Sequence, residues 1–173
     1  MIATTATDPP AAATGPKLVV DTSAWIEWFV DSDIGRLVDA ALSQPERCIV
    51  PTIVQMELAK WALRELPEDQ HLRLVRLTQK CHVDALDSGT AFMAASANVE
   101  HKLALADAII YATAQKFGAE VVTCDAHFKG LPAVRFYPKL TRASENSIPA
   151  FSPWERWPTS DQFDHPQLTW PRQ

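Results

Sequence analysis

Apolar positions along residues 17–140 follow two alternating patterns. Short, continuous apolar runs rich in β-branched residues are typical of buried strands, whereas apolar residues recurring every three or four positions are typical of amphipathic helices. The strand-like runs cover residues 17–21, 47–51, 83–87, 119–125 and 134–138.

Helical periodicity fills most of the intervening chain. Asp33 is a candidate N-cap of the second helical segment, and Gly118 stands where the last one should end. Repeated strand–helix units predict an α/β fold with three layers, α/β/α, around a mostly parallel central sheet. The predicted helices cover residues 22–30, 34–42, 52–66, 69–80, 89–102 and 105–117.

The two ends of the chain differ from this middle region in composition. Residues 1–16 are mostly Ala, Thr and Pro without a helical or strand period, and we interpret them as a flexible tail that lacks the features of a secretory signal. Residues 141–173 hold five of the 13 prolines and three of the six tryptophans. This extension could cross to a dimer partner, dock a separate protein or be poorly folded, but we favour its packing against the body of the protein. The predicted organisation is therefore one domain, 17–140, between two extensions.

Composition narrows the classes of function. A chain of 173 residues with a net charge of −5 is long enough for one domain, but it is too acidic to hold nucleic acid by its whole surface. A nucleic-acid partner would need a local basic patch or a bound metal ion. The three cysteines include no C-x-x-C pair, which argues against zinc or a disulfide framework and favours a reducing cytoplasm. No apolar run is long enough to span a bilayer.

Four acids are placed so that the predicted fold brings them together. Two follow strand-like runs, one lies in the first turn of a helix, and one lies in the second turn of another helix. In a doubly wound sheet the carboxyl ends of the strands and the following helix N-termini share one edge, where ligands bind. The four acids are Asp21 and Asp125 after strands, and Glu57 and Asp107 in helices.

Each acid also has a structural alternative when it is taken alone. Asp21 could cap a helix, Asp107 could complement a helix dipole, and Asp125 could serve a turn. Glu57 is harder to explain structurally, because it interrupts an apolar helix face. The joint pattern is more specific than any member, and converging carboxylates repel one another unless a cation binds between them.

The expected cation is Mg²⁺, with Mn²⁺ as the alternative, because both prefer oxygen ligands. Such ions can activate water for attack on a phosphodiester. Two hydroxyl residues, Ser23 and Thr123, flank two of the acids and could hydrogen-bond a carboxylate or a metal-bound water, although cap and turn roles fit equally well.

Four stretches of the sequence resemble the PIN-domain family, and in particular the VapC toxins. They keep the order and approximate spacing of the family's acidic motifs, including D-T-S after the first strand and T-x-D-x-x-F near the end. The stretches are VVDTSAWIEWF (19–29), PTIVQMELAK (51–60), LALADAIIYATA (103–114) and VVTCDAHFKGL (121–131).

The resemblance implies a Mg²⁺-dependent endoribonuclease, the toxin of a VapBC-like toxin–antitoxin pair. It assigns metal binding and catalysis to Asp21, Glu57, Asp107 and Asp125, with Ser23 and Thr123 in supporting roles. It also implies a homodimer, a VapB-like antitoxin, and a tRNA or ribosomal RNA substrate that is cut by metal-activated water. The chain departs from the compact family pattern by its extensions at both ends. These extensions could change the dimer and the antitoxin contact that the resemblance implies.

Three alternatives remain open. The first is a non-catalytic PIN-fold module that binds RNA or protein. The second is another Mg²⁺-dependent phosphotransfer enzyme, although Asp21 lacks the D-x-D pattern of such phosphatases. The third is a structure-specific nuclease acting on DNA. Basic residues in 60–80 could guide RNA or form an ordinary solvated helix face, since acids interleave with them.

Overall fold

The computed structural model describes residues 15–139, and its centre is a five-stranded sheet in the order β3-β2-β1-β4-β5. Every neighbouring pair of strands is parallel. All five predicted strands are present, and the mostly parallel α/β architecture is confirmed. The strands are β1 (Leu18–Val20), β2 (Cys48–Pro51), β3 (His82–Asp84), β4 (Glu120–Thr123) and β5 (Val134–Phe136).

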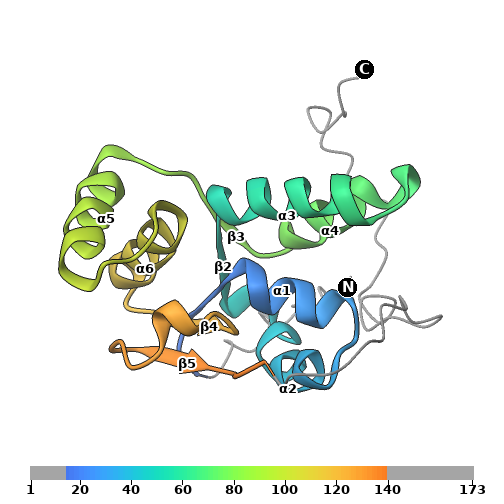
Figure 1. The fold of residues 1–173 in the computed structure, drawn as a ribbon, viewed down its shortest axis with the longest axis horizontal. Coiled ribbons are helices and arrows are strands. Elements are labelled where there is room, and N and C mark those ends of the chain that lie inside the picture. The colour runs from blue at the N-terminus through green and yellow to red at the C-terminus, as the bar shows by residue number, and fades with distance from the viewer. Residues whose placement is uncertain (1–14, 140–173) are drawn as a thin grey trace, which may run out of the picture.

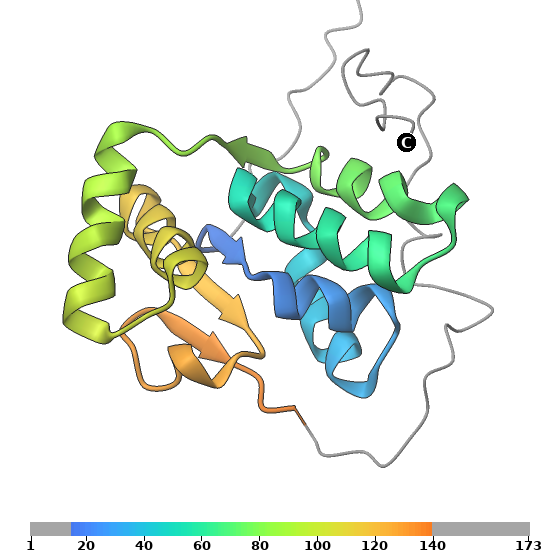
Figure 2. The ribbon, with the colours of Figure 1, turned by 45° about the horizontal axis from the view of Figure 1, so that its top comes forward.

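Within residues 15–139, six α-helices surround the sheet. Helices α5 and α6 pack together at one end of the molecule and α1 to α4 gather at the other, as both views show (Figures 1 and 2). The helices are α1 (Thr22–Phe29), α2 (Asp33–Leu42), α3 (Thr52–Glu65), α4 (His71–Thr78), α5 (Ser88–His101) and α6 (Leu105–Phe117); three short 3-10 turns are η1 (Pro45–Arg47), η2 (Glu68–Gln70) and η3 (Ala126–Phe128).

Three predicted boundaries were wrong, each for a local reason. The N-cap of α2 is Ser32, whose hydroxyl accepts from the Gly35 amide at 2.9 Å, and Asp33 is the first helical residue. The predicted helix 69–80 begins with the separate turn η2. Strand β3 stops at Asp84 rather than 87, because Asp87 already caps α5 by accepting from Thr90. By contrast, Gly118 ends α6 in the left-handed conformation, as predicted.

The order of the strands creates a switch point beside β1. The chain moves from β1 to β2 and β3 in one direction, then returns to place β4 on the other side of β1. Crevices that bind ligands form outside the carboxyl ends of strands at such a point. Residues that follow β1 and β4 therefore face a ready-made ligand-binding edge.

The core fixes the elements that lead to this edge. All three residues of β1 are fully buried, and Trp25 and Trp28 of α1 are buried with their rings edge to face at 5.7 Å. Trp28 also donates its indole N–H to Asp39 of α2 at 2.8 Å, so α1 is anchored on both sides. Gly35 lets α2 approach α1, because a Cβ there would lie 2.1 Å from the Glu27 carbonyl oxygen.

The three cysteines are buried free thiols, in keeping with the predicted lack of disulfides. No helix within residues 15–139 is both long and apolar enough to cross a lipid bilayer. The predicted tails, 1–16 and 141–173, fall almost wholly outside the described residues, and so does the expected packing of the C-terminal extension.

Candidate active site

Asp21 sits at the switch point, where β1 passes into α1. Its amide donates to the Val122 carbonyl of β4 at 2.9 Å, and its side chain caps α1 and is only 4% exposed. Carboxylate oxygen Oδ2 accepts from the Ser23 hydroxyl, from the Ser23 amide at 3.3 Å and from the Thr123 hydroxyl at 2.8 Å. Burial raises the pKa of Asp21, and these donors oppose the rise.

The two hydroxyls also tie the ends of β1 and β4 together. Ser23 Oγ accepts from the Cys124 amide and Thr123 Oγ1 accepts from the Asp125 amide, both at 2.9 Å. Each hydroxyl therefore donates to Asp21 and accepts from the chain that follows β4. This arrangement orients the Asp21 carboxylate with respect to Asp125.

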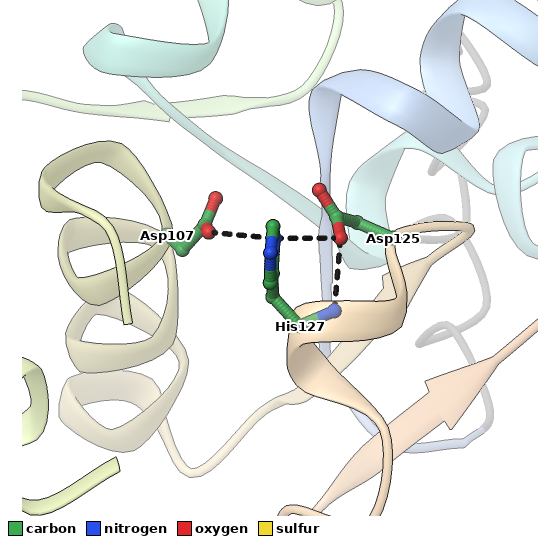
Figure 3. Close-up of side chains that lie close together, drawn as sticks. All are labelled: Asp107, Asp125 and His127. Atoms are coloured by element: carbon green, nitrogen blue, oxygen red, sulfur yellow. Dashed lines mark hydrogen bonds and ion pairs between the residues drawn. The ribbon is translucent and has the colours of Figure 1, made fainter. Parts of the chain in front are cut away.

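Asp125 follows β4 and caps the turn η3. Its Oδ1 accepts from the His127 amide at 2.9 Å and lies 3.0 Å from His127 Nδ1. The same imidazole nitrogen is 3.8 Å from Asp107 Oδ2, so the ring lies between the two acids (Figure 3). The donor atoms of Asp107, Asp125 and His127 all lie within 4.8 Å of one another, a separation that one metal ion can bridge.

Asp107 projects from the first turn of α6, which begins at the same edge of the sheet. Burial raises the pKa of Asp107 to about 6, with further upward contributions from the charges of Asp125, Asp21 and Glu57 and a downward one from His127. All three other acids are thus close enough to act on this carboxyl.

Glu57 reaches the site from the second turn of α3. Thr22, the first residue of α1, donates its hydroxyl to Glu57 Oε2 at 2.6 Å. Burial raises the pKa of Glu57, the negative charge of Asp21 adds to the rise, and the positive charge of Lys60 opposes it. The four predicted acids therefore come from four separate elements to one edge of the sheet.

This donor set fits a hard divalent cation. Without a cation, burial and mutual repulsion hold the pKa values of Asp21, Glu57 and Asp107 above their ordinary range. A cation reverses this tendency, because it favours the charged form of every carboxylate around it. Oxygen ligands of this kind suit Mg²⁺ and Mn²⁺.

Two neighbours of the acids were not predicted from the sequence. Thr22 enters the sequence pattern only as part of the D-T-S motif, and His127 shows none of the paired spacing, such as H-x-x-x-H, that marks zinc ligands. The available signal for His127 was its place two residues after a strand-ending acid. For Thr22 the signal was its place directly after Asp21, which puts its hydroxyl at the same edge.

The basic residues in region 60–80, which could guide RNA, are only partly directed at the site. Lys60 acts on Glu57 from α3, one turn further along the helix. Arg64, in contrast, forms an exposed ion pair with its neighbour Glu65 at 2.6 Å. An RNA-guiding role for this region therefore stays a prediction.

The PIN domain family model matches residues 18–134, and the chain belongs to this family. Among solved structures, the fold resembles chains of several VapC-type toxin–antitoxin proteins. A toxin–antitoxin complex from Klebsiella pneumoniae matches with 24% identity and a TM-score of 0.60, covering 71% of this chain and 100% of that one.

Two further matches are of the same kind. The DNA-bound VapBC of Salmonella typhimurium matches with 21% identity and a TM-score of 0.58, covering 72% of this chain and 98% of that one. VapC20 of Mycobacterium tuberculosis, a sarcin–ricin loop cleaving toxin, matches with 20% identity and a TM-score of 0.56, covering 70% and 100%. At these identities the likeness establishes the shared fold. The comparison with curated proteins gives no match.

Proposed function

We propose that this protein is a divalent-metal-dependent endoribonuclease and the toxin of a VapBC-like toxin–antitoxin pair. The observation that carries the proposal is the meeting of Asp21, Glu57, Asp107 and Asp125 at the switch point of a PIN-domain sheet, close enough for their charges to act on Asp107. We assign metal binding and catalysis to these four acids, with Ser23 and Thr123 as supporting hydroxyls.

The chain's own residues would prepare the site for RNA. Ser23 and Thr123 hold Oδ2 of Asp21 in one orientation, and Thr22 does the same for Glu57. Fixed carboxylates need no rearrangement when the reaction begins, which is the source of much enzymatic rate enhancement. Negative charge alone would repel a phosphodiester, so the acids require cations before they can accept this substrate.

Mg²⁺ or Mn²⁺, held by the four acids, would supply an activated water and neutralise charge that develops on the phosphate. Glu57 and Asp107 are half-buried, so each is partly accessible from outside to an RNA backbone. Lys60 is placed to attract that backbone, because its exposed side chain lies one helical turn from Glu57.

A toxin of this kind would have a VapB-like antitoxin as its partner. The support is the fold shared with chains of a toxin–antitoxin complex and of VapBC. We further expect a homodimer, an RNA substrate of the tRNA or ribosomal class, and action in the cytoplasm, the compartment that three free buried thiols fit.

The alternative from another class is a PIN-fold module that binds RNA or protein without cutting it. Such a module would have no need for four converging carboxylates, among which Asp21, Glu57 and Asp107 have raised pKa values, since uncompensated charge repulsion destabilises a fold. The two functions differ in one observable, the metal-dependent appearance of RNA fragments.

The test is incubation of the full chain, free of antitoxin, with total cellular RNA in Mg²⁺, in Mn²⁺ and in EDTA. Asp21→Asn serves as the inactive variant, because asparagine can still cap α1. Asp69→Asn serves as its matched control, because Asp69 is an exposed acid in η2, outside the site. Discrete fragments that need metal and disappear only in Asp21→Asn would support the nuclease. Fragments that persist in EDTA, or none with either metal from folded protein, would refute it.

A further inference from the structure

His127 stands in the acidic site on a rigid piece of backbone, although its ring is 73% exposed. The turn η3 that carries it is capped by Asp125, whose Oδ1 accepts the His127 amide at 2.9 Å. The next residue, Phe128, is fully buried in the core. The position of the His127 Cβ is therefore fixed on both sides, and Nδ1 points toward Asp107 and Asp125 (Figure 3).

The two separations of His127 Nδ1 from the acids fall within the range spanned by ligands that share one ion. An octahedral ion with metal–ligand distances of about 2.1 Å places adjacent donors about 3.0 Å apart and opposite donors about 4.2 Å apart. His127 Nδ1 is 3.0 Å from Asp125 Oδ1 and 3.8 Å from Asp107 Oδ2. The imidazole thus occupies a ligand-like position beside two carboxylates.

We propose that His127 supplies a nitrogen ligand, together with Asp107 and Asp125, and that it makes this site prefer Mn²⁺ to Mg²⁺. The inference rests on the proposed metal-dependent function and refines its cofactor. Mg²⁺ strongly prefers oxygen and keeps its waters, whereas imidazole is a good ligand for first-row transition metals. A neutral Nδ1 in this position adds affinity for Mn²⁺ and little for Mg²⁺.

The same contacts allow an opposite role, which the experiment separates. A protonated His127 would form ion pairs with Asp125 and Asp107 and compete with any cation for them. Removal of the imidazole would then tighten metal binding. A nitrogen ligand and a competing cation therefore predict changes of opposite sign in the same measurement.

The test compares Mn²⁺ and Mg²⁺ binding by the full chain and three variants, without RNA. Free Mn²⁺ is followed by its electron paramagnetic resonance signal, and Mg²⁺ affinity is obtained by competition. His127→Phe keeps a flat ring without a nitrogen donor. His82→Phe is the matched control, because His82 is an exposed histidine at the start of β3, at the opposite edge of the sheet. Asp107→Asn marks loss of the proposed site itself.

The expected result is a loss of about tenfold or more in Mn²⁺ affinity for His127→Phe, with Mg²⁺ affinity changed by less than about threefold. Pulsed resonance on wild-type protein with ¹⁵N-labelled histidine should show a nitrogen coupled to Mn²⁺ that disappears in His127→Phe and persists in His82→Phe. Unchanged or tighter Mn²⁺ binding in His127→Phe, while Asp107→Asn binds weakly, would overturn this inference alone. Failure of the wild type to bind either ion would overturn the proposed function as well.

Discussion

In the metal-free protein, the charged Asp107 carboxylate destabilises the folded state. Substitution by the uncharged asparagine would remove this destabilisation. Its pKa rises from 3.8 to about 6, which at about 1.4 kcal/mol per pKa unit corresponds to about 3 kcal/mol of penalty on the charged form. Because the group is partly exposed to water, we discount this to about 1 to 2 kcal/mol. Asp107→Asn should therefore raise the free energy of unfolding by that amount at pH 7.5 in EDTA.

The pH dependence of this gain has a definite sign. The native state holds its proton to higher pH than the unfolded state, so the wild type loses stability relative to the variant as the pH rises from about 4 through about 6. Above that window the difference stays constant, and below it the difference vanishes. Addition of Mn²⁺ should make the wild type more stable than Asp107→Asn, because only the wild type has the full set of charged ligands.

Urea denaturation followed by circular dichroism measures the effect directly at pH 4 and pH 7.5. Asp69→Asn is the control for removal of an acid outside the site, and it should change the free energy of unfolding by less than about 0.5 kcal/mol. An Asp107→Asn protein that is equally stable or less stable than the wild type at pH 7.5 in EDTA would refute the reasoning.

Three further predictions concern the supports of the site. Thr123→Val should cost about 1 to 3 kcal/mol in urea denaturation, because the buried hydroxyl donates to Asp21, and an unchanged midpoint would contradict the network. Gly35→Ala should lower the free energy of unfolding by about 3 kcal/mol, because its Cβ would lie 2.1 Å from the Glu27 carbonyl oxygen. Gly89→Ala is the control, because the nearest atom to its Cβ would be 3.4 Å away, and this variant should melt near the wild-type temperature. Similar melting temperatures for the two variants would refute this prediction. Mn²⁺ at 100 times its Kd should stabilise the wild type by about 2.7 kcal/mol in thermal melts and leave the Asp21→Asn variant nearly unaffected, and an equal rise in both would place the ion elsewhere.

Much of this architecture could be predicted from sequence, because the strands are short and the central ones, β1 and β2, are wholly apolar and buried. The buried run Leu18–Val20 is followed directly by Asp21, and a similar apolar run before Asp125 predicts a second strand, which the structure has at Glu120–Thr123. Predicted boundaries failed where a side chain decided the end of an element. Ser32, rather than Asp33, caps α2 because its hydroxyl reaches the Gly35 amide, and either residue type is a good N-cap.

The acids could be predicted from position alone, whereas their contacts could not. A parallel sheet brings residues after β1 and β4 to one edge whatever their side chains are, so Asp21 and Asp125 followed from topology. The place of His127 depends on the turn η3, in which its own amide bonds back to Asp125. Spacing rules for histidine pairs do not describe a histidine that lies between an acid of its own turn, Asp125, and an acid of a separate helix, Asp107.

The most direct test of a single four-acid site is the RNA cleavage rate in Mn²⁺ of the Asn or Gln variants of Asp21, Glu57, Asp107 and Asp125, together with the Asp21→Asn/Asp107→Asn double variant. Residues that act as one unit give losses that are far from additive. We predict that each single variant loses about a thousandfold or more, and that the double variant loses less than about tenfold beyond either single one. A single variant that stays within about tenfold of the wild type, or a double variant whose loss is the product of the two single losses, would contradict the account.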